Sequence, residues 1–233
     1  MAVDQPLENP VETTLRDGTR VLVRRVEPDD KQRLAEGLAR LSTRSRYLRF
    51  HTGVKQLSDR QLRYLTEVDQ QNHVAWAAID LDAPDQPGIG VARFVRVADR
   101  ADAAEAAVTV LDEYQGRGLG TILLGILTFA AVRRGIRAFR SYVLGENQAM
   151  LDLFEALGAT LTEDEPGVYV VELPLPQTPD DLTLAAAGKV FHAISGKELP
   201  PLRSTAPPVW VAEDVAERPL LRDWLDKLLD RWS

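Results

Sequence analysis

Apolar and polar residues follow two patterns along the chain, one typical of strands and one typical of helices. Compact or alternating apolar runs predict strands at 73–81, 88–97, 103–111, 136–144 and 168–175. Apolar residues three and four positions apart predict helices at 27–42, 58–68, 119–134 and 147–158. An Asp17-Gly18 turn between two extended arms predicts a hairpin over 13–26. The order of these elements predicts a mixed α/β fold with one βαβ crossover near residue 120.

Local signals mark where several of these elements begin and end. Ser58 and Gln61 have the spacing of a capping box at the start of the second helix. Gly135 and Gly158 end the third and fourth helices, and the segment 163–167 predicts a turn before the last strand. In the third helix one apolar face is expected to be buried, and it consists of Leu119, Ile122, Leu123, Ile126, Leu127 and Ala130.

The composition changes near Pro174, which predicts two parts of the chain, a core domain at 11–175 and a proline-rich extension at 176–233. The extension contains two amphipathic helical patterns, at 180–194 and 218–232. In the second pattern the apolar stripe consists of Leu221, Trp224, Leu225, Leu228 and Trp232. Because such a stripe is too apolar to stay in water, it is expected to pack on the core or on a second copy in a homodimer.

The segment 110–124, VLDEYQGRGLGTILL, places three glycines between a predicted strand and an apolar helix. Gly116, Gly118 and Gly120 do not match a dinucleotide-binding fingerprint, because the final spacing is wrong. They do not match a nucleotide-binding P-loop either, because no lysine stands before Thr121. Free N–H groups at a helix N-terminus bind phosphate, and side chains here would block its approach. The segment therefore predicts a pyrophosphate site, with a ligand-free tight turn as the alternative.

The sequence QGRGLG from Gln115 to Gly120, after a strand ending at Val110, closely resembles motif A of the GCN5-related N-acetyltransferases, the GNAT family. The resemblance covers about residues 11–175. It implies a GNAT-type α/β fold, with a mixed, mostly antiparallel sheet flanked by helices, and acetyl-CoA as co-substrate. The residues that it implies as contacts of acetyl-CoA are Val108, Val110, Gln115, Gly116, Arg117, Gly118, Leu119, Gly120, Thr121, Asn147 and Phe154.

Two further segments, LSTRSRYLRFH at 41–51 and LTEVDQQNHVAWAAID at 65–80, resemble bacterial protein-lysine acetyltransferases of the same family. The implied acceptor is the ε-amine of a protein lysine. For the segment 44–50, the alternative is a basic, partly packed loop without a substrate role. Two other functions stay open at this point: acetylation of a small amine, and binding of acyl-CoA without catalysis.

Acetyl transfer to lysine needs a general base, because the amine is almost wholly protonated at neutral pH. Glu105 is the only acid in the strand run 103–111, and the family resemblance implies that it is this base. The other candidates are expected to have no catalytic part, with His51, His73 and His192 structural or exposed and Asp112 and Glu113 solvated.

The general acid is less clear from the sequence than the base. Phe154 stands where many members of the family have a tyrosine that protonates the departing thiolate, and phenylalanine cannot donate a proton. A thiol with a pKa near ~8.5 can leave as thiolate without help, and Tyr142 and Tyr169 are weaker substitutes for the acid. Asn147 is expected to contact the cofactor, to cap the following helix, or both.

Composition limits the classes of binding partner and the cellular compartment that are expected for this chain. The 233 residues carry a net charge of −7, which argues weakly against nucleic acid as a partner. The chain has no cysteine, which excludes disulfides and thiolate metal sites, and no metal is expected. No apolar run is long enough to span a membrane, and residues 1–12 lack the apolar core of a secretory signal. These features predict a cytoplasmic protein that is not bound to membranes.

Overall fold

The computed structural model describes residues 10–50, 54–98 and 100–176. The strands are β1 (Val11–Thr14), β2 (Arg20–Arg25), β3 (His73–Asp80), β4 (Gly88–Val97), β5 (Arg100–Val110), β6 (Ala138–Leu144), β7 (Thr160–Glu165) and β8 (Val168–Pro174). The helices are η1 (Pro28–Asp30), α1 (Lys31–Arg40), α2 (Thr43–Phe50), α3 (Asp59–Thr66), η2 (Asp112–Tyr114), α4 (Leu119–Val132) and α5 (Gln148–Ala156). The helices expected at 180–194 and 218–232 lie outside the described residues, as do His51 and His192.

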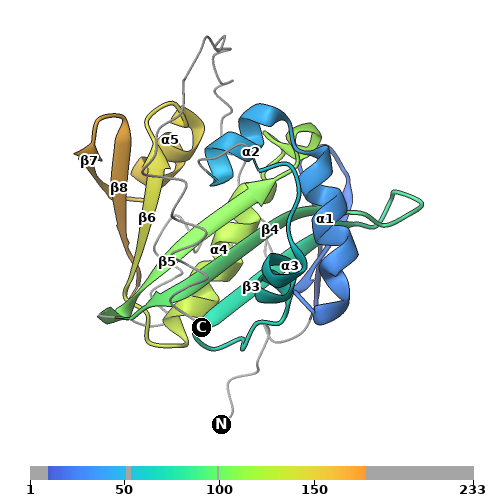
Figure 1. Ribbon diagram of the computed structural model, residues 1–233, viewed down its shortest axis with the longest axis horizontal. Helices are drawn as coiled ribbons and strands as arrows, with labels where there is room; N and C mark the ends of the chain where they lie inside the picture. Colours follow the sequence, from blue (N-terminus) through green and yellow to red (C-terminus); the bar gives the residue numbers. More distant parts are fainter. Residues whose placement is uncertain (1–9, 51–53, 99, 177–233) are drawn as a thin grey trace.

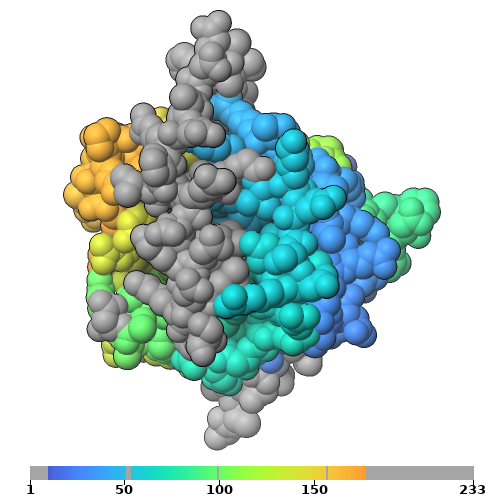
Figure 2. All heavy atoms as spheres, viewed as in Figure 1, coloured from blue at the N-terminus to red at the C-terminus, as the bar shows by residue number. Residues whose placement is uncertain are grey.

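All eight strands belong to one sheet in the order β1-β2-β3-β4-β5-β6-β8-β7. Neighbouring strands run antiparallel except β5 and β6, which run parallel and are joined by α4. In Figure 1, α1 and α3 lie in front of the sheet and α4 lies behind it. The space-filling view shows the blue-to-cyan residues of α1, α2 and α3 as one continuous surface (Figure 2). The expected mixed, mostly antiparallel α/β fold with one βαβ crossover is confirmed.

Helix α4 is buried on nearly every side rather than along the single face expected from the sequence. Each residue from 123 to 132 is buried, and α4 packs on β3, β4 and β5. Ile122, assigned to the buried face, is only partly buried. A helix that is apolar all round is typical of such a central position. At 14 residues, α4 is too short to cross a bilayer, and no other helix in the described ranges qualifies.

Two elements differ from the sequence-based expectation. The segment 160–165 forms β7, although its end was expected to belong to a turn. This strand pairs with β8 at the edge of the sheet and is almost wholly exposed, so its polar residues carry no alternation that predicts a strand. The basic segment 43–50 forms α2 rather than a loop, and Phe50 is its buried residue.

The parallel ladder between β5 and β6 is short. Only Ala103 with Ala138 and Ala104 with Phe139 pair across it, whereas β6 pairs with β8 along its whole length. Beyond Ala104, β5 continues to Val110 beside β4 alone. The sheet therefore opens between β5 and β6 at the end of β5 that leads to the glycine loop, which is defined here as residues 115–120.

Candidate functional site

A cleft of about 530 Å³ lies where β5 and β6 part. Its lining includes residues 106–110, Gln115, Gly116, Gly118, Gly120, Thr121, residues 141–143, Asn147 and Phe154. Just beyond the parallel ladder, the Ser141 hydroxyl donates a 2.8 Å hydrogen bond to the Ala106 carbonyl. Most of the residues that the sequence predicted for cofactor binding, from strand, loop and helix, thus surround this β5–β6 cleft.

Strand β5 presents backbone groups to the cleft. The Leu111 N–H donates toward β4, to the Ile89 carbonyl at 3.0 Å. The carbonyls of Ala106 and Val110 instead accept side-chain hydrogen bonds on the opposite edge, and that of Val110 receives Gln115 Nε2 at 3.1 Å. Because backbone groups alternate along a strand, the N–H and carbonyl of Val108 face this same open edge. An extended ligand with amide groups could pair with β5 there.

The glycine loop delivers free N–H groups to one end of the cleft. Gly116 and Gly118 have φ of +72° and +92°, in the left-handed region that favours glycine. Gly118 is the N-cap of α4 and provides no side-chain cap. Within the described chain, the N–H groups of Leu119, Gly120 and Thr121 make no backbone hydrogen bond. These unpaired donors and the helix dipole form a site suited to a phosphate or pyrophosphate.

The side chains of Arg117 and Leu119 do not line the cleft. Arg117 makes a 2.6 Å ion pair with Asp17 in the β1–β2 turn, and its guanidinium lies 5.0 Å from the ring centroid of Tyr114. The Leu119 side chain is buried in the core. Only the backbone groups of these two residues are therefore placed to contact a ligand at the loop.

Asp112 and Glu113, in η2 just before the glycine loop, are exposed as expected, and they also pair with residues of the neighbouring helices. The Asp112 carboxylate accepts hydrogen bonds from the Ser42 N–H and hydroxyl and from the Ser45 hydroxyl, at 2.7–2.9 Å. Burial opposes ionisation of Asp112, but these hydrogen bonds prevail and its pKa lies below the usual value. Glu113 pairs with Arg40 at 2.6 Å. Together they connect η2, which leads into the glycine loop, to α1 and α2.

The opposite wall of the cleft comes from the start of α5 and from β6. Asn147 precedes α5 without a side-chain capping hydrogen bond, so its expected capping role is wrong and its amide is available to a ligand. Phe154 is buried and lines the cleft with its ring. Two tyrosines were considered as the general acid. Tyr142 lines the cleft, whereas Tyr169 of β8 does not line it and has its ring beside Gly145.

Glu105 lies beside the cleft rather than among the residues that line it. It is half-buried on β5 opposite Val95 of β4. Two residues from the helical layer, Arg49 of α2 and Tyr64 of α3, interact electrostatically with its carboxylate. Arg49 also lines the cleft, so it connects Glu105 with the ligand space.

Two arginines that the sequence did not single out make this region cationic. Burial lowers the pKa of Arg49 to about 10, against the favourable charge of Glu105. Burial and the charge of Arg49 lower the pKa of Arg93 to about 9. Because arginine is rarely buried, the sequence gave no signal that Arg93 on β4 would be a buried charge beside Arg49. Arg49 thus interacts both with Glu105, which offsets part of its charge, and with Arg93.

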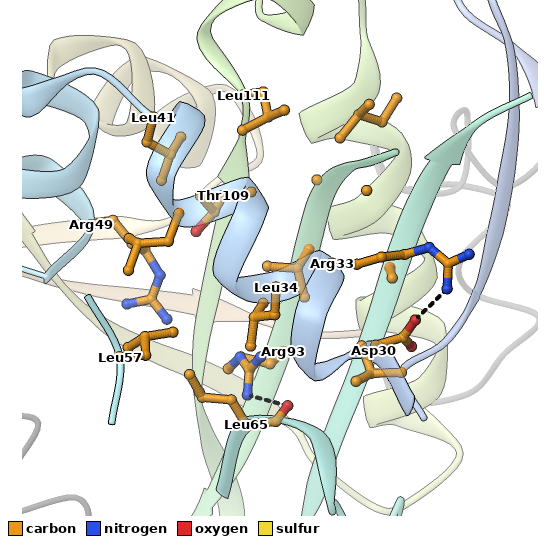
Figure 3. Close-up of a pocket in the computed structure, with 18 of the residues that line it drawn as sticks. Asp30, Arg33, Leu34, Leu41, Arg49, Leu57, Leu65, Arg93, Thr109 and Leu111 are labelled. Carbon is orange, nitrogen blue, oxygen red and sulfur yellow. Dashed lines mark hydrogen bonds and ion pairs between the residues drawn. The ribbon is translucent and has the colours of Figure 1, made fainter. Parts of the chain in front are cut away.

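A smaller, largely apolar cavity of about 90 Å³ lies beneath α1 (Figure 3). Arg49 and Thr109 line both this cavity and the cleft, so the two spaces adjoin. Arg93 donates to the Leu65 carbonyl at 3.3 Å, and Arg33 pairs with the buried Asp30 at 3.4 Å. Arg33 and Arg93, two of the polar side chains that line the cavity, are thus paired within the protein.

His73 has the structural role expected from the sequence. It is buried at the start of β3, 3.1 Å from an Arg93 nitrogen, and its ring lies 4.9 Å from that of Tyr64. Burial and the charge of Arg93 lower the pKa of His73 to about 3, so it is a poor base at neutral pH. No group of three His, Asp or Glu side chains in the described ranges could hold a metal ion.

The depressed pKa of His73 predicts a loss of stability in mild acid. The unfolded chain binds the proton near pH 6.5 and the folded chain only near pH 3, so unfolding is favoured as pH falls below about 6.5. We expect His73→Gln to remove about 2 kcal/mol of the loss between pH 7 and 5, measured by urea unfolding. An equal pH dependence in wild type and His73→Gln would contradict the assignment.

Comparison with known proteins places the cleft in a family context. A sequence profile described as an acetyltransferase (GNAT) domain matches residues 20–160. Acetyltransferase Pat of Mycolicibacterium smegmatis is 36% identical over 167 residues, which cover 72% of this chain and 49% of that protein. An acetyltransferase of Pseudomonas aeruginosa is 34% identical over 145 residues, or 62% of this chain and 77% of that protein. The chain thus spans about half the length of the Mycolicibacterium relative.

Solved structures agree with the sequence matches. The GNAT domain of S. lividans PAT superposes with a TM-score of 0.67 at 32% identity and covers 74% of this chain and 100% of that one. A phosphinothricin acetyltransferase of Sinorhizobium meliloti, solved in complex with acetyl-CoA, has a TM-score of 0.55 at 15% identity. It covers 68% of this chain and 90% of that one, and at this identity it shows a shared fold alone.

Proposed function

The chain belongs to the acetyltransferase (GNAT) family, and on this premise we propose that it transfers the acetyl group of acetyl-CoA to an amine. The preferred acceptor is the ε-amine of a protein lysine. The observation that carries the proposal is the cleft between the parting strands β5 and β6, closed at one end by the free N–H groups of the glycine loop.

The proposed cofactor lies along β5. The pyrophosphate accepts hydrogen bonds from the first-turn N–H groups of α4, where the helix dipole favours negative charge. The pantetheine arm, which carries amides, pairs with the open edge of β5 at Val108. This arrangement directs the thioester away from the glycine loop and along β5 toward the part of the strand that contains Glu105. The complex of the Sinorhizobium meliloti relative with acetyl-CoA supports the choice of cofactor.

The proposed reaction is direct attack. Glu105 accepts the proton of the ammonium group, directly or through one water, and the neutral amine attacks the thioester carbonyl carbon. The C–N bond forms as the C–S bond breaks, and the nitrogen then loses its second proton to solvent, which gives an amide and CoA thiolate. Phe154 cannot protonate the sulfur, but a thiol with a pKa near ~8.5 leaves as thiolate without an acid.

Protein lysine is preferred as acceptor because two segments resemble protein-lysine acetyltransferases, and acetyltransferase Pat and the GNAT domain of S. lividans PAT are among the similar proteins. The segments 41–51 and 65–80 carry the resemblance to protein-lysine acetyltransferases. Arg49 in the first segment and Tyr64, which directly precedes the second, interact electrostatically with Glu105. These segments therefore contribute to the space in which an acceptor amine must meet the base. Acetylation of a small amine is the second candidate within the same chemistry.

Isotope-labelled acetyl-CoA tests the proposal. The protein is incubated with a bacterial protein extract and, separately, with a panel of small amines, and labelled products are counted by mass spectrometry. We expect labelled acetyl-lysine at a few sites, in amounts that follow the enzyme concentration and disappear without enzyme. If only small amines were labelled, the acceptor would be a small amine rather than a protein lysine. Tight binding of acetyl-CoA without any transfer would indicate a regulatory acyl-CoA-binding protein instead.

A further inference from the structure

The turn between β1 and β2 is fastened to the glycine loop. The Arg16 N–H donates to the Arg117 carbonyl at 3.2 Å, and Asp17 forms a 2.6 Å ion pair with the Arg117 guanidinium. Asp17 also accepts the Thr19 N–H at 3.1 Å, which fixes its carboxylate within the turn. One backbone hydrogen bond and one ion pair therefore hold the hairpin tip to the loop, although the two lie about a hundred residues apart in the sequence.

The Arg16 side chain extends from this turn over the start of α4. A Cβ atom on Gly118 would lie 3.5 Å from Arg16 Nε, and Arg16 lines the β5–β6 cleft. Its guanidinium makes no hydrogen bond or ion pair with any residue in the described ranges. The neighbouring Arg20 and Arg117, in contrast, are paired with Asp82 and Asp17. An unpaired cation thus stands beside unpaired N–H donors at one end of the cleft.

We infer that Arg16 is a cofactor-binding residue that contacts the pyrophosphate of acetyl-CoA, an inference that rests on the proposed function. A pyrophosphate held only by backbone N–H groups keeps much of its charge uncompensated. A guanidinium adds planar, charged donors whose geometry matches phosphate oxygens. Arg16 is the nearest side chain to the Cβ position of Gly118, which places its charge over the helix N-terminus.

This assignment moves the expected arginine contact from Arg117 to Arg16, a residue to which the sequence alone gave no role. Arg117 stands inside the glycine motif and was the expected ligand contact, but its charge is neutralised by Asp17. Arg117 therefore positions the hairpin, and the hairpin in turn supplies Arg16 to the ligand. No local sequence signal indicates this, because the contact depends on how β1 and β2 pack beside the loop.

The test compares Arg16→Gln with Arg20→Gln, a matched control in the same hairpin whose arginine pairs with Asp82 outside the cleft. Affinity is measured by calorimetry for acetyl-CoA and for 3′-dephospho-acetyl-CoA, and turnover is measured with S-acetylpantetheine, which lacks the pyrophosphate. We expect Arg16→Gln to weaken both nucleotide thioesters about 10- to 30-fold, which corresponds to one lost charge-assisted contact. Turnover of S-acetylpantetheine should stay unchanged, and Arg16→Lys should restore part of the affinity.

Each other outcome has a definite meaning. Equal affinities of Arg16→Gln and wild type would overturn the inference while the proposed function stands. A loss for acetyl-CoA but not for the dephospho compound would assign Arg16 to the 3′-phosphate and overturn the pyrophosphate contact. Equal losses in the Arg20→Gln control would show a general effect of hairpin charge and overturn it as well. A wild-type protein that binds neither thioester would overturn the proposed function, and the inference with it.

Discussion

Replacing Glu105 by Gln should lower turnover about 10²- to 10⁴-fold at pH 7 while acetyl-CoA affinity is retained. Glutamine keeps the shape of the side chain but cannot accept the proton, and this range is typical for loss of a general base. Glu105 does not line the cofactor cleft, which is the structural reason to expect unchanged binding. Release of CoA at saturating acceptor gives the rate, and calorimetry gives the affinity.

The pH dependence and a control make this prediction specific. The residual rate of Glu105→Gln should rise about tenfold per pH unit below the amine pKa, because only the spontaneously neutral amine then reacts. Glu172→Gln is the matched control. Glu172 is a strand glutamate on β8 that pairs with Arg100 of β5, away from Arg49. Wild-type turnover in Glu105→Gln at pH 7 would show that another group is the base.

Replacing Gly118 by Val should weaken acetyl-CoA binding at least tenfold, and about a hundredfold if two charge-assisted hydrogen bonds are lost. The branched side chain would enter the space between the α4 N-terminus and Arg16, where the pyrophosphate is proposed to lie. Valine also tolerates poorly the φ of +92° that Gly118 adopts. Calorimetry on the folded variant measures the effect.

Gly135→Val separates ligand blocking from backbone strain. Gly135 has a comparable φ of +75°, and a Cβ there would meet no atom within 4 Å. It follows α4 at the end opposite the cleft, so its substitution should cost stability without changing acetyl-CoA affinity. If Gly118→Val and Gly135→Val changed the affinity equally, the glycine loop would be a turn without a ligand role.

The fold was predictable where its signals are local. The Asp17-Gly18 turn, the Ser58–Gln61 capping box and the glycine loop each depend on a few adjacent residues, and all three appear as expected. Strand β7 escaped prediction because an exposed edge strand needs no apolar alternation. The nearly complete burial of α4 also depends on the sheet packed against it, which periodicity alone does not report.

The sequence predicted the loop and the strand that form the candidate site better than it predicted which charged side chains meet there. Glycine spacing identified the loop, and the strand run 103–111 identified Glu105 as a candidate. The sequence could not show that Arg49 is desolvated beside Glu105 or that Arg93 is desolvated beside Arg49, because the three residues belong to different elements. Similarly, Arg117 could not be known to pair with Asp17 before the hairpin was placed beside the loop. Long-range packing determines these contacts.

Hydrogen–deuterium exchange of backbone amides, with and without saturating acetyl-CoA, tests the proposed cofactor site most directly. Leu119, Gly120 and Thr121 have N–H groups without a partner among residues 10–50, 54–98 and 100–176, and Val108 faces the open edge of β5. We predict that acetyl-CoA slows exchange at these four amides by at least tenfold and leaves the distant turn at Asp85 and Gln86 unchanged. Bound acetyl-CoA with unaltered exchange at the glycine loop would contradict the site and place the pyrophosphate elsewhere.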